Sequence, residues 1–420
     1  MSVPSRPLPP HLAEPKLTIL EEADTEAFTA ALVRGFHDDY NPELAKPFLK
    51  VLEHDRAFGF TVDGRWVATC GAYTRTMTVP GGSVPTAAVT VVTVSPTYRR
   101  RGLLTAMMKQ QLEDIHRRSE PVALLWASES LIYGRFGYGQ ATARLRISGP
   151  TRSTAFLPGV DLGAGSVGEV EREDWLAAAE SLYARLLAER PGGLNRDPDW
   201  WQARLHDPAQ WRHGATALRF VLHYGEQGEV DGFAAFRVKS GDEGDIANSE
   251  VQVTEIEAAE PSAYASLWRF LLDLDLVRKF TRGHAPVDEP LRYLAADPRM
   301  ITTELSDGTY ARLVDVPRAL EARSYASDVD VLIAVSDPLL PHNDATFRLQ
   351  GGRDGSTVSA TQRSADVSFS VRDLGAIYLG GTSLSSLHAA GLVQERTPGA
   401  VAAITAAFAS DRAPFCADHF

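Results

Sequence analysis

Residues 91–104 read VVTVSPTYRRRGLL and are the most informative stretch of the chain. Residues 87–94, which lead into the turn, are β-branched and almost continuously apolar, as is typical of a strand buried on both faces of a sheet. Residues 103–115 repeat apolar side chains at three- and four-residue spacing, which predicts a helix. The arginines therefore lie in a turn between a buried strand and the start of a helix.

This turn is suited to bind an anion. Successive backbone N–H groups and the helix macrodipole attract negative charge there, and Gly102 allows a phosphate to approach closely. Each of Arg99, Arg100 and Arg101 would cost roughly 0.3–1 kcal/mol at the positive end of a helix if no anion were bound. We therefore expect a pyrophosphate site; an exposed basic turn without a ligand is the alternative.

Residues 132–139 form a second dense feature and read IYGRFGYG. They follow a strand predicted at 122–126. The glycines permit a tight reversal of the chain, and the aromatic side chains of Tyr133, Phe136 and Tyr138 could line a cleft. A packed aromatic turn without chemistry is the alternative interpretation.

The surrounding pattern predicts two similar halves. In the first half we expect a helical segment at 17–52, a hairpin of 58–61 and 66–70 around Asp63-Gly64, the strand at 87–94, the helix at 103–115 and the strand at 122–126. In the second half we expect a helix at 175–187, strands at 232–238 and 251–256, and a helix at 264–276. Aligning residues 253–256 with 92–95 places 259–262 (AEPS) opposite the arginines and glycine. We interpret the second half as a structural copy without anion chemistry; a chance similarity is the alternative.

From about residue 313 the sequence pattern changes, which indicates an α+β region. Short alternating strands are expected at 331–335, 345–349, 356–360 and 365–371, followed by helices at 383–390 and 399–409. Residues 411–420 show no clear element.

Bulk properties exclude several classes of protein. A chain of 420 residues exceeds the size of one core, so two or three domains are expected, and 44% hydrophobic with 23% charged residues is typical of a soluble globular protein. No apolar run reaches the roughly 18 residues of a spanning helix, and residues 1–15 read as a frayed leader without a secretory pattern. Two distant cysteines, Cys70 and Cys416, indicate a reducing cytosol. The net charge of −12 argues against nucleic acid and suits a cationic substrate. No metal-binding motif or serine-hydrolase elbow is present, so we expect no metal.

The chain resembles the enhanced-intracellular-survival (Eis) family of GNAT acetyltransferases. Arg99 and Gly102 match the GNAT signature Arg-x-x-Gly-x-(Gly/Ala), whereas Leu104 departs from its usual small residue. The resemblance also rests on residues 127–129 (ASE), 132–139, 317–323 (PRALEAR) and 406–420, and it covers nearly the whole chain. It implies a flexible leader (1–16), a catalytic GNAT domain (17–165), a GNAT-like domain without a coenzyme site (166–312) and a sterol-carrier-protein-like domain (313–420). It also implies acetyl-CoA as the acetyl donor and a homohexamer; the cytoplasmic location is expected from the two cysteines.

The same resemblance implies roles for individual residues. Tyr133 would be the general acid that protonates the departing thiolate, since an unperturbed phenol pKa of about 10 lies near that of a thiol. The terminal carboxylate of Phe420 would be the base or proton acceptor. The coenzyme would be held by Val92, Val94, Arg99, Arg100, Gly102, Leu103 and Leu104, with Ser128 near the thioester. The amine would be bound by Asp38, Phe48, Val91 and His419, and an aminoglycoside or other polyamine is the implied substrate.

Two departures from the family fall in the substrate pocket. His419 replaces an acidic residue and Val91 replaces a large aromatic one, which bears on the choice of amine.

The pKa of the terminal carboxylate, near 3.5, lies about seven units below that of an alkylammonium, or roughly 9 kcal/mol, which is too far for it to act as a simple base. It must be desolvated, act through water, or chiefly position the amine. His419 could share the role, or could be a solvated tail histidine.

Two other functions remain as alternatives. A non-catalytic lipid or hydrophobe carrier could act through the third domain, and a sensor could bind acetyl-CoA without transferring the acetyl group. Release of free thiol in the presence of an amine would separate both from an enzyme.

Overall fold

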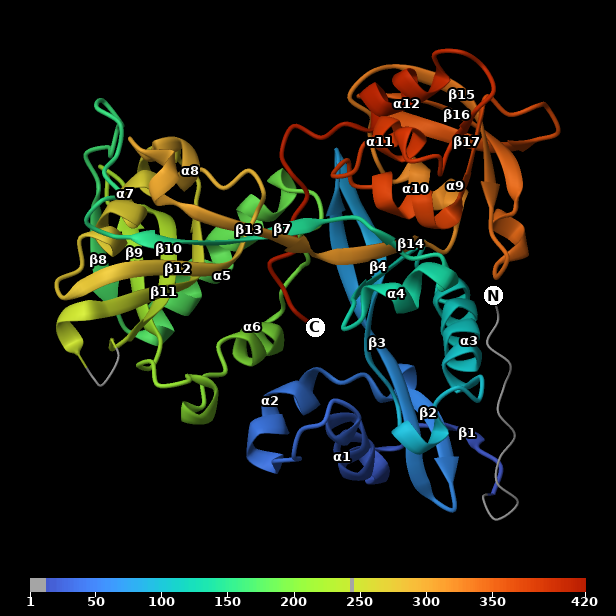
Figure 1. Cartoon of the computed structure of the whole chain (residues 1–420), viewed down its shortest axis with the longest axis horizontal. Coiled ribbons are helices and arrows are strands. Elements are labelled where there is room, and N and C mark those ends of the chain that lie inside the picture. The colour runs from blue at the N-terminus through green and yellow to red at the C-terminus, as the bar shows by residue number, and fades with distance from the viewer. Residues whose placement is uncertain (1–12, 242–244) are drawn as a thin grey trace. The chain divides into compact units, whose positions relative to one another are not determined.

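The computed structural model describes residues 13–241 and 245–420 (Figure 1). Most of the expected leader therefore lies outside the described residues. The chain forms two compact units. The first unit contains the chain up to Thr142 together with Thr309–Asp411 and Asp418–Phe420, and the second contains Ala143–Gly308 and Arg412–Ala417.

The first unit is built on a seven-stranded sheet. Its strand order is β1-β2-β3-β4-β5-β14-β6. The strands are β1 (Lys16–Ile19), β2 (Phe58–Val62), β3 (Arg65–Val79), β4 (Gly82–Val94), β5 (Val122–Trp126), β14 (Thr309–Leu313) and β6 (Gly139–Gln140). Its helices are α1 (Thr25–Gly35), α2 (Pro42–Val51), α3 (Leu103–Arg117) and α4 (Ser130–Tyr133).

One pair of neighbouring strands in this sheet diverges. β4 and β5 pair in parallel from Thr86–Val89 to Val122–Leu125 and then separate. Beyond this point β4 pairs only with β3, and Trp126 of β5 pairs with Thr309 of β14. We call this divergence, formed by Thr90–Val94 and Trp126, the first splay. The helix α3 follows β4, so its N-terminus and the splay are adjacent in the chain.

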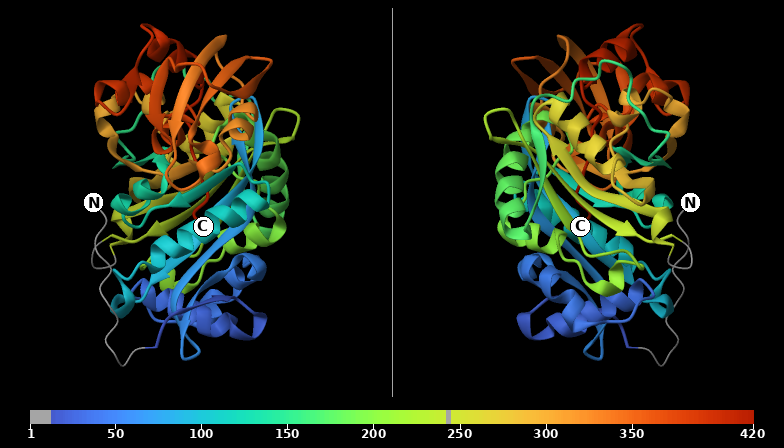
Figure 2. Two further views of the ribbon diagram at one scale, coloured as in Figure 1. Left: turned by 90° about the vertical axis from the view of Figure 1, so that its right-hand side faces the viewer. Right: turned by 90° about the vertical axis from the view of Figure 1, so that its left-hand side faces the viewer.

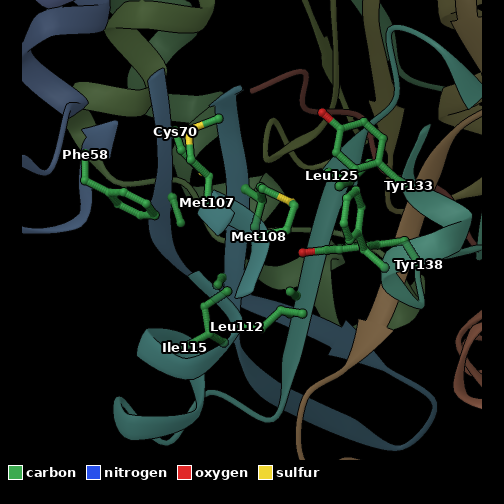
Figure 3. Close-up of a cluster of buried hydrophobic side chains, with 14 of the residues drawn as sticks. Phe58, Cys70, Met107, Met108, Leu112, Ile115, Leu125, Tyr133 and Tyr138 are labelled. Atoms are coloured by element: carbon green, nitrogen blue, oxygen red, sulfur yellow. The ribbon is translucent and has the colours of Figure 1, made fainter. Parts of the chain in front are cut away.

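The core of this sheet explains why α3 forms where it does. Met107, Met108, Leu112 and Ile115 recur at helical spacing and are buried in one cluster with Leu125 (Figure 3). Each fully buried side chain of this size contributes about 1.5–3 kcal/mol. Packing against the sheet therefore fixes the helix and, with it, the position of the arginine turn.

A five-stranded sheet also belongs to the first unit. Its order is β17-β16-β15-β18-β19, and the strands are β15 (Val329–Ser336), β16 (Ala345–Gly352), β17 (Gly355–Thr361), β18 (Val367–Ser370) and β19 (Gln394–Glu395). The accompanying helices are α9 (Val316–Glu321), α10 (Val371–Ile377), α11 (Leu384–Ala389) and α12 (Ala400–Phe408). This layer, drawn in orange and red, lies at the end of the unit opposite α1 and α2 (Figures 1 and 2).

The second unit repeats the GNAT-like arrangement. Its sheet has the order β13-β7-β12-β11-β10-β9-β8. The strands are β7 (Ala143–Pro150), β8 (Ser166–Val170), β9 (Arg219–Tyr224), β10 (Val230–Lys239), β11 (Ser249–Ala258), β12 (Val277–Ala285) and β13 (Thr302–Asp307). Its helices are α5 (Arg172–Leu186), α6 (Pro198–Arg204), α7 (Pro261–Leu272) and α8 (Leu291–Leu294). β11 and β12 pair in parallel from Ser249–Val253 to Val277–Arg282, the counterpart of the β4–β5 pair.

The predicted fold class is confirmed, with two GNAT-like sheets and an α+β third region. The hairpin around Asp63-Gly64 and the strand at 122–126 are also confirmed. The helical prediction for 17–52 is wrong at its start, because Lys16–Ile19 pairs with Phe58–Thr61 as an edge strand. The predicted strand at 365–371 is too long, because the Ser370 side chain and Asp373 form a capping box that begins α10.

The alignment of the two halves also needs correction. The last paired residue before the splay is Val89 in the first half and Val253 in the second, three positions from the expected register. The next helix begins at Leu103 in the first half but already at Pro261 in the second. The second half therefore has a shorter turn, and the arginine segment has no full-length counterpart there.

Two strands cross between the halves of the chain. β7 follows β6 in sequence but joins the second sheet, where it lies between β12 and β13. β14 follows β13 in sequence but lies between β5 and β6 of the first sheet. Among the described residues, no helix has the length and apolar character needed to cross a membrane.

Candidate active site

The N-terminus of α3 is open to a ligand. Gly102 is the N-cap with a left-handed backbone (φ 83°), it has no side chain to cap the helix, and the first turn contains no acidic residue. A Cβ atom placed on Gly102 would meet nothing within 4 Å, so there is space directly at the helix end. Leu103 is buried and Leu104 half-buried beneath it. Uncapped amides at a helix N-terminus favour a phosphate.

The three arginines of the turn differ in their surroundings. Arg99 and Arg100 are exposed, although the Arg99 Nε donates to the carbonyl of Val94 at 3.2 Å. The guanidinium of Arg101 lies 5.0 Å from the centre of the Tyr98 ring, in a cation–π contact. Arg99 and Arg100 thus present positive charge at the helix end, whereas Arg101 packs on the protein. These residues fit a polyanionic coenzyme.

The first splay presents backbone groups beside this turn. The register shifts between β3 and β4, since Gly71 faces Thr90 and Thr69 faces Thr93, and Val91 has a positive φ of 50°. The Thr69 hydroxyl donates to the Val91 carbonyl at 2.7 Å and fixes this bulge. A bulge leaves residues unpaired in the ladder. Val91 and Val92 consequently have no partner in the β3–β4 or β4–β5 pairing of the described residues.

Tyr133 lies at the end of α4, at the edge of the buried cluster. Its side chain is 8% exposed, and burial raises its pKa well above the ordinary value, with smaller contributions from Cys70 and Glu129. Burial likewise raises the pKa of Tyr138, which the nearby Arg312 only partly offsets. Both phenols are therefore protonated at neutral pH, which is the state in which a phenol can act as a general acid.

The two tyrosines are not equivalent. Their ring centres lie 6.0 Å apart at an interplanar angle of 74°. Figure 3 shows the Tyr138 hydroxyl pointing into the cluster towards Met108, whereas the Tyr133 hydroxyl points away from it. The Tyr138 oxygen is buried and has no hydrogen-bond partner in the described part of the chain. This geometry favours Tyr133 as the residue that reaches a substrate.

The third region holds the turn that carries these tyrosines. Arg312 on β14 is fully buried, donates from Nε to the Phe136 carbonyl at 3.0 Å, and pairs with both carboxylate oxygens of Asp337 at 2.8 and 2.6 Å. A Cβ on Gly139 would lie 2.0 Å from the Arg372 carbonyl of α10, so only glycine fits there. The glycines predicted to permit a reversal therefore also permit close packing against α10.

The C-terminal residues lie at the end of β5. Trp126 donates its indole N–H to the carbonyl of Asp418 at 2.9 Å, and its ring stacks on His419 with centres 5.0 Å apart and an interplanar angle of 23°. Phe420, the last residue, is half-buried. Ser128 is exposed two residues beyond Trp126, and α4 with Tyr133 follows. The structure thus brings His419 to the strand end that leads to Tyr133.

Trp126 was not predicted as a site residue. Its only sequence signal is its place as the last residue of a predicted strand, immediately before the 127–129 block. Nothing in a local pattern indicates that its partner lies in the tail. An aromatic residue at the end of a central strand is a signal that could have drawn attention to it.

The predicted amine-binding residues are spread over several elements. Asp38 is exposed after α1, whose last residue, Gly35, packs so closely on β4 that an added Cβ would lie 2.6 Å from the Thr93 Cβ. Val91 is half-buried on the bulge and packs against the cluster around Trp66. Phe48 lies on α2 with 39% of its side chain exposed. Val91 thus lies on the β4 side of the splay and His419 on its β5 side, whereas Asp38 follows α1, the helix that packs on β4.

Most of the chain is similar to known protein families. Families described as "Acetyltransferase (GNAT) domain" match residues 16–141 and 192–313, and one described as "Sterol carrier protein domain" matches 316–417. An uncharacterized N-acetyltransferase of Streptomyces avermitilis is 41% identical over 96% of this chain and 98% of its own length. N-acetyltransferase Eis of Mycobacterium tuberculosis is 36% identical over 80% of this chain and 81% of its own length. The crystal structure of Eis1 from Mycobacterium abscessus superposes with a TM-score of 0.84 at 36% identity, covering 97% of this chain and all of that one.

Proposed function

Because the chain belongs to the Eis family of GNAT N-acetyltransferases, we propose that it transfers the acetyl group of acetyl-CoA directly to an amine, with Tyr133 as general acid and the Phe420 carboxylate as base. N-acetyl transfer is the activity of the family, and GNAT acetyltransferases use acetyl-CoA as donor. The main support for the residue assignment is the hydrogen bond from the Trp126 indole to the carbonyl of Asp418 in the tail. Trp126 is the last residue of β5, the strand that leads to Tyr133.

The coenzyme is bound, in this proposal, at the start of α3 and along the bulged part of β4. The amides of Gly102, Leu103 and Leu104 and the side chains of Arg99 and Arg100 bind the pyrophosphate. The open space at Gly102 and the exposure of both arginines support this assignment. The backbone of Val92 and Val94 binds the pantetheine arm, and Ser128 lies near the thioester.

Tyr133 supplies a proton as the thiol departs. Burial keeps the phenol protonated at neutral pH, which is the state a general acid needs. A phenol whose pKa is raised gives its proton only to a strong base. We therefore expect proton transfer to accompany cleavage of the C–S bond, when negative charge develops on sulfur, rather than to precede it.

The Phe420 carboxylate acts on the amine. Direct proton transfer between an unperturbed carboxylate and an alkylammonium is unfavourable by roughly 9 kcal/mol, so the carboxylate must work through water, through desolvation or by holding the amine electrostatically. The half-burial of Phe420 supports partial desolvation. The stacking of His419 on Trp126 supports a packing role for that histidine in addition to contact with the amine.

An aminoglycoside or another polyamine is the substrate class we propose. The net charge of −12 and the exposed carboxylate of Asp38 suit a polycation. Val91, where relatives in the family carry a large aromatic residue, leaves more room beside the bulge. A homohexameric assembly and a cytoplasmic location are part of the same proposal.

One experiment tests the reaction and its substrate class together. Acetyl-CoA is incubated with the protein and a panel of aminoglycosides, linear polyamines and lysine peptides, while free thiol is measured and each product is weighed by mass spectrometry. We expect thiol release matched by one or more mass increments of an acetyl group on polyamines. Coenzyme binding without thiol release would indicate a sensor, and the absence of both would favour a carrier.

A further inference from the structure

The second unit contains a splay like the one in the first. β11 and β12 stop pairing after Val253 and Arg282, and each then continues beside its outer neighbour, β10 or β7. We call this divergence the second splay; it is formed by Thr254–Ala258 of β11 and Gly283–Ala285 of β12. In the first unit the equivalent position is where we place the coenzyme.

A coenzyme does not suit the second splay. The helix that follows it begins at Pro261 behind Glu260, a negative charge where the first unit has arginines and glycine. Beside the splay, Arg282 pairs with Glu289, and Tyr264 donates to the same carboxylate at 2.6 Å. All three groups are mostly or fully buried. The charged groups beside the second splay are thus already paired with one another.

A segment of the chain's own tail lies there instead. Residues 412–417 belong to the second unit. The Cys416 carbonyl accepts from Nε2 of His284 on β12 at 2.7 Å, and Arg412 forms an ion pair with Glu189 at 3.3 Å. Phe415 and Cys416 are buried. The β12 side of the splay, through His284, therefore contacts this short segment.

The segment is held mainly through its backbone. Asp288 and Arg190 pair with each other, and together they bind Ala413: its N–H donates to Asp288 at 3.1 Å and its carbonyl accepts from Arg190 at 2.8 Å. The Phe415 N–H donates to the Pro191 carbonyl at 2.9 Å. Gly192 follows, and a Cβ there would lie 3.1 Å from the Phe415 carbonyl oxygen. Four backbone groups of three residues are thus satisfied by the second unit.

His284 has the protonation state and tautomer that this contact needs. Burial, and then the charges of Arg204, Arg144 and Arg282, lower its pKa to about 4, so the ring is neutral at pH 7. Nδ1 lies 3.3 Å from an Arg144 nitrogen, which can only donate, so Nδ1 accepts and Nε2 carries the proton. The Phe415 ring packs on the imidazole with centres 4.8 Å apart.

We propose that the second splay is a binding site for the C-terminal segment 412–417, and that His284 is a positioning residue that sets where the Phe420 carboxylate lies. This inference rests on the proposed role of that carboxylate. Cys416 is four residues from the C-terminus, and the next fixed carbonyl, that of Asp418, is held by Trp126. The second unit thereby binds the residues that directly precede the proposed base in the chain.

The test combines a structural readout with kinetics on the full-length protein. His284→Leu removes the donor, and His284→Gln retains an N–H near the position of Nε2. His388→Leu is the matched control, because His388 also hydrogen-bonds a backbone carbonyl, that of Val393 at 2.9 Å in the third region. Amide hydrogen exchange is followed at Ala413 and Phe415, and kcat and the KM for acetyl-CoA are measured with one polyamine.

We expect His284→Leu to speed exchange at Phe415 about five- to tenfold, as loss of one hydrogen bond implies, and to lower kcat while the KM for acetyl-CoA is unchanged. His284→Gln should recover much of both effects, and His388→Leu should leave tail exchange at its original rate. Unchanged exchange in His284→Leu overturns the inference whatever the activity. A further outcome is faster exchange but unchanged kcat in His284→Leu, while a C-terminal extension of the wild type still inactivates the enzyme. This result overturns the positioning role of His284. If the extension is also harmless, the proposed base is wrong, and the tail-binding site is supported alone.

Discussion

The indole N–H of Trp126 donates to the backbone carbonyl of Asp418, which is 292 positions away in the chain, over 2.9 Å. The same indole stacks on the ring of His419. Two separate interactions from one side chain thus fix consecutive residues of the tail. Phe420, which carries the proposed base, is the next residue, so these contacts leave it little freedom.

Trp126→Phe should therefore lower activity through the tail. Phenylalanine keeps a ring for His419 but loses the N–H donor, and a hydrogen bond of about 0.5–1.5 kcal/mol predicts a two- to tenfold lower kcat. Coenzyme affinity should not change, because Arg99, Arg100 and Gly102 are untouched. Steady-state kinetics with each substrate varied checks both expectations.

The matched control for this change is Trp211→Phe. Trp211 is a partly exposed tryptophan of the second unit and has no part in the proposed chemistry. A fall in kcat of the same size in Trp211→Phe would contradict a role of Trp126 through the tail.

An extension of three residues after Phe420 should abolish turnover. It replaces the terminal carboxylate with a neutral peptide bond and moves the charge away from Trp126. Binding of acetyl-CoA, measured by calorimetry, should persist because the α3 turn is unaffected. The same three residues added before Met1 serve as the control, and full activity of the C-terminally extended enzyme would rule out the carboxylate.

Tyr133→Phe and Tyr138→Phe should have different effects although both tyrosines are buried. Loss of a general acid predicts a fall in kcat of about 10²–10⁴-fold for Tyr133→Phe with a small change in KM. The Tyr138 hydroxyl is buried and has no hydrogen-bond partner among residues 13–241 and 245–420, so its removal should leave kcat nearly unchanged and should not reduce stability. Rate constants and thermal unfolding of both variants check this, and a larger kinetic loss in Tyr138→Phe would reverse the assignment.

Local signals explain what could be predicted from the sequence. The strand, arginine turn and α3 follow one another within one stretch, so periodicity and Gly102 were sufficient to predict them. The capping box of Ser370 and Asp373 was equally local and could have revealed α10. Pairing of Trp126 with Asp418, and the insertion of β14 beside β5, join residues far apart in the chain and depend on the packing of the whole unit. No local pattern carries that information.

The three arginines of the turn should separate into two classes. Arg99→Ala and Arg100→Ala should each raise the KM for acetyl-CoA about tenfold, since charge-assisted hydrogen bonds are worth about 1.5–3 kcal/mol and these side chains are exposed. Arg101→Ala should chiefly lower the unfolding temperature, because its guanidinium packs on Tyr98. Kinetics at two salt concentrations test this further, as the penalty for Arg99 and Arg100 should shrink at high salt. Equal effects of all three changes on KM would contradict the division.

The lowered pKa of His284 predicts a pH-dependent stability of the second unit. The pKa is about 4 in the folded protein and near 6.5 when the chain is unfolded, so the unfolded chain binds a proton first as the pH falls. The contribution is complete above pH 6.5 and is lost between pH 6.5 and about 4, on the order of 3 kcal/mol in total. Urea unfolding from pH 4 to 8 measures it, with His284→Gln as the variant that cannot take up the proton. As the pH falls, the free energy of unfolding should decrease more steeply for the wild type than for the variant, and only within this window. Protonation of His284 places a positive charge beside Arg144, whereas the glutamine of the variant takes up no proton. Parallel curves would show that the imidazole is not held neutral by its surroundings, and the tautomer assigned from Arg144 and Cys416 would then lose its basis.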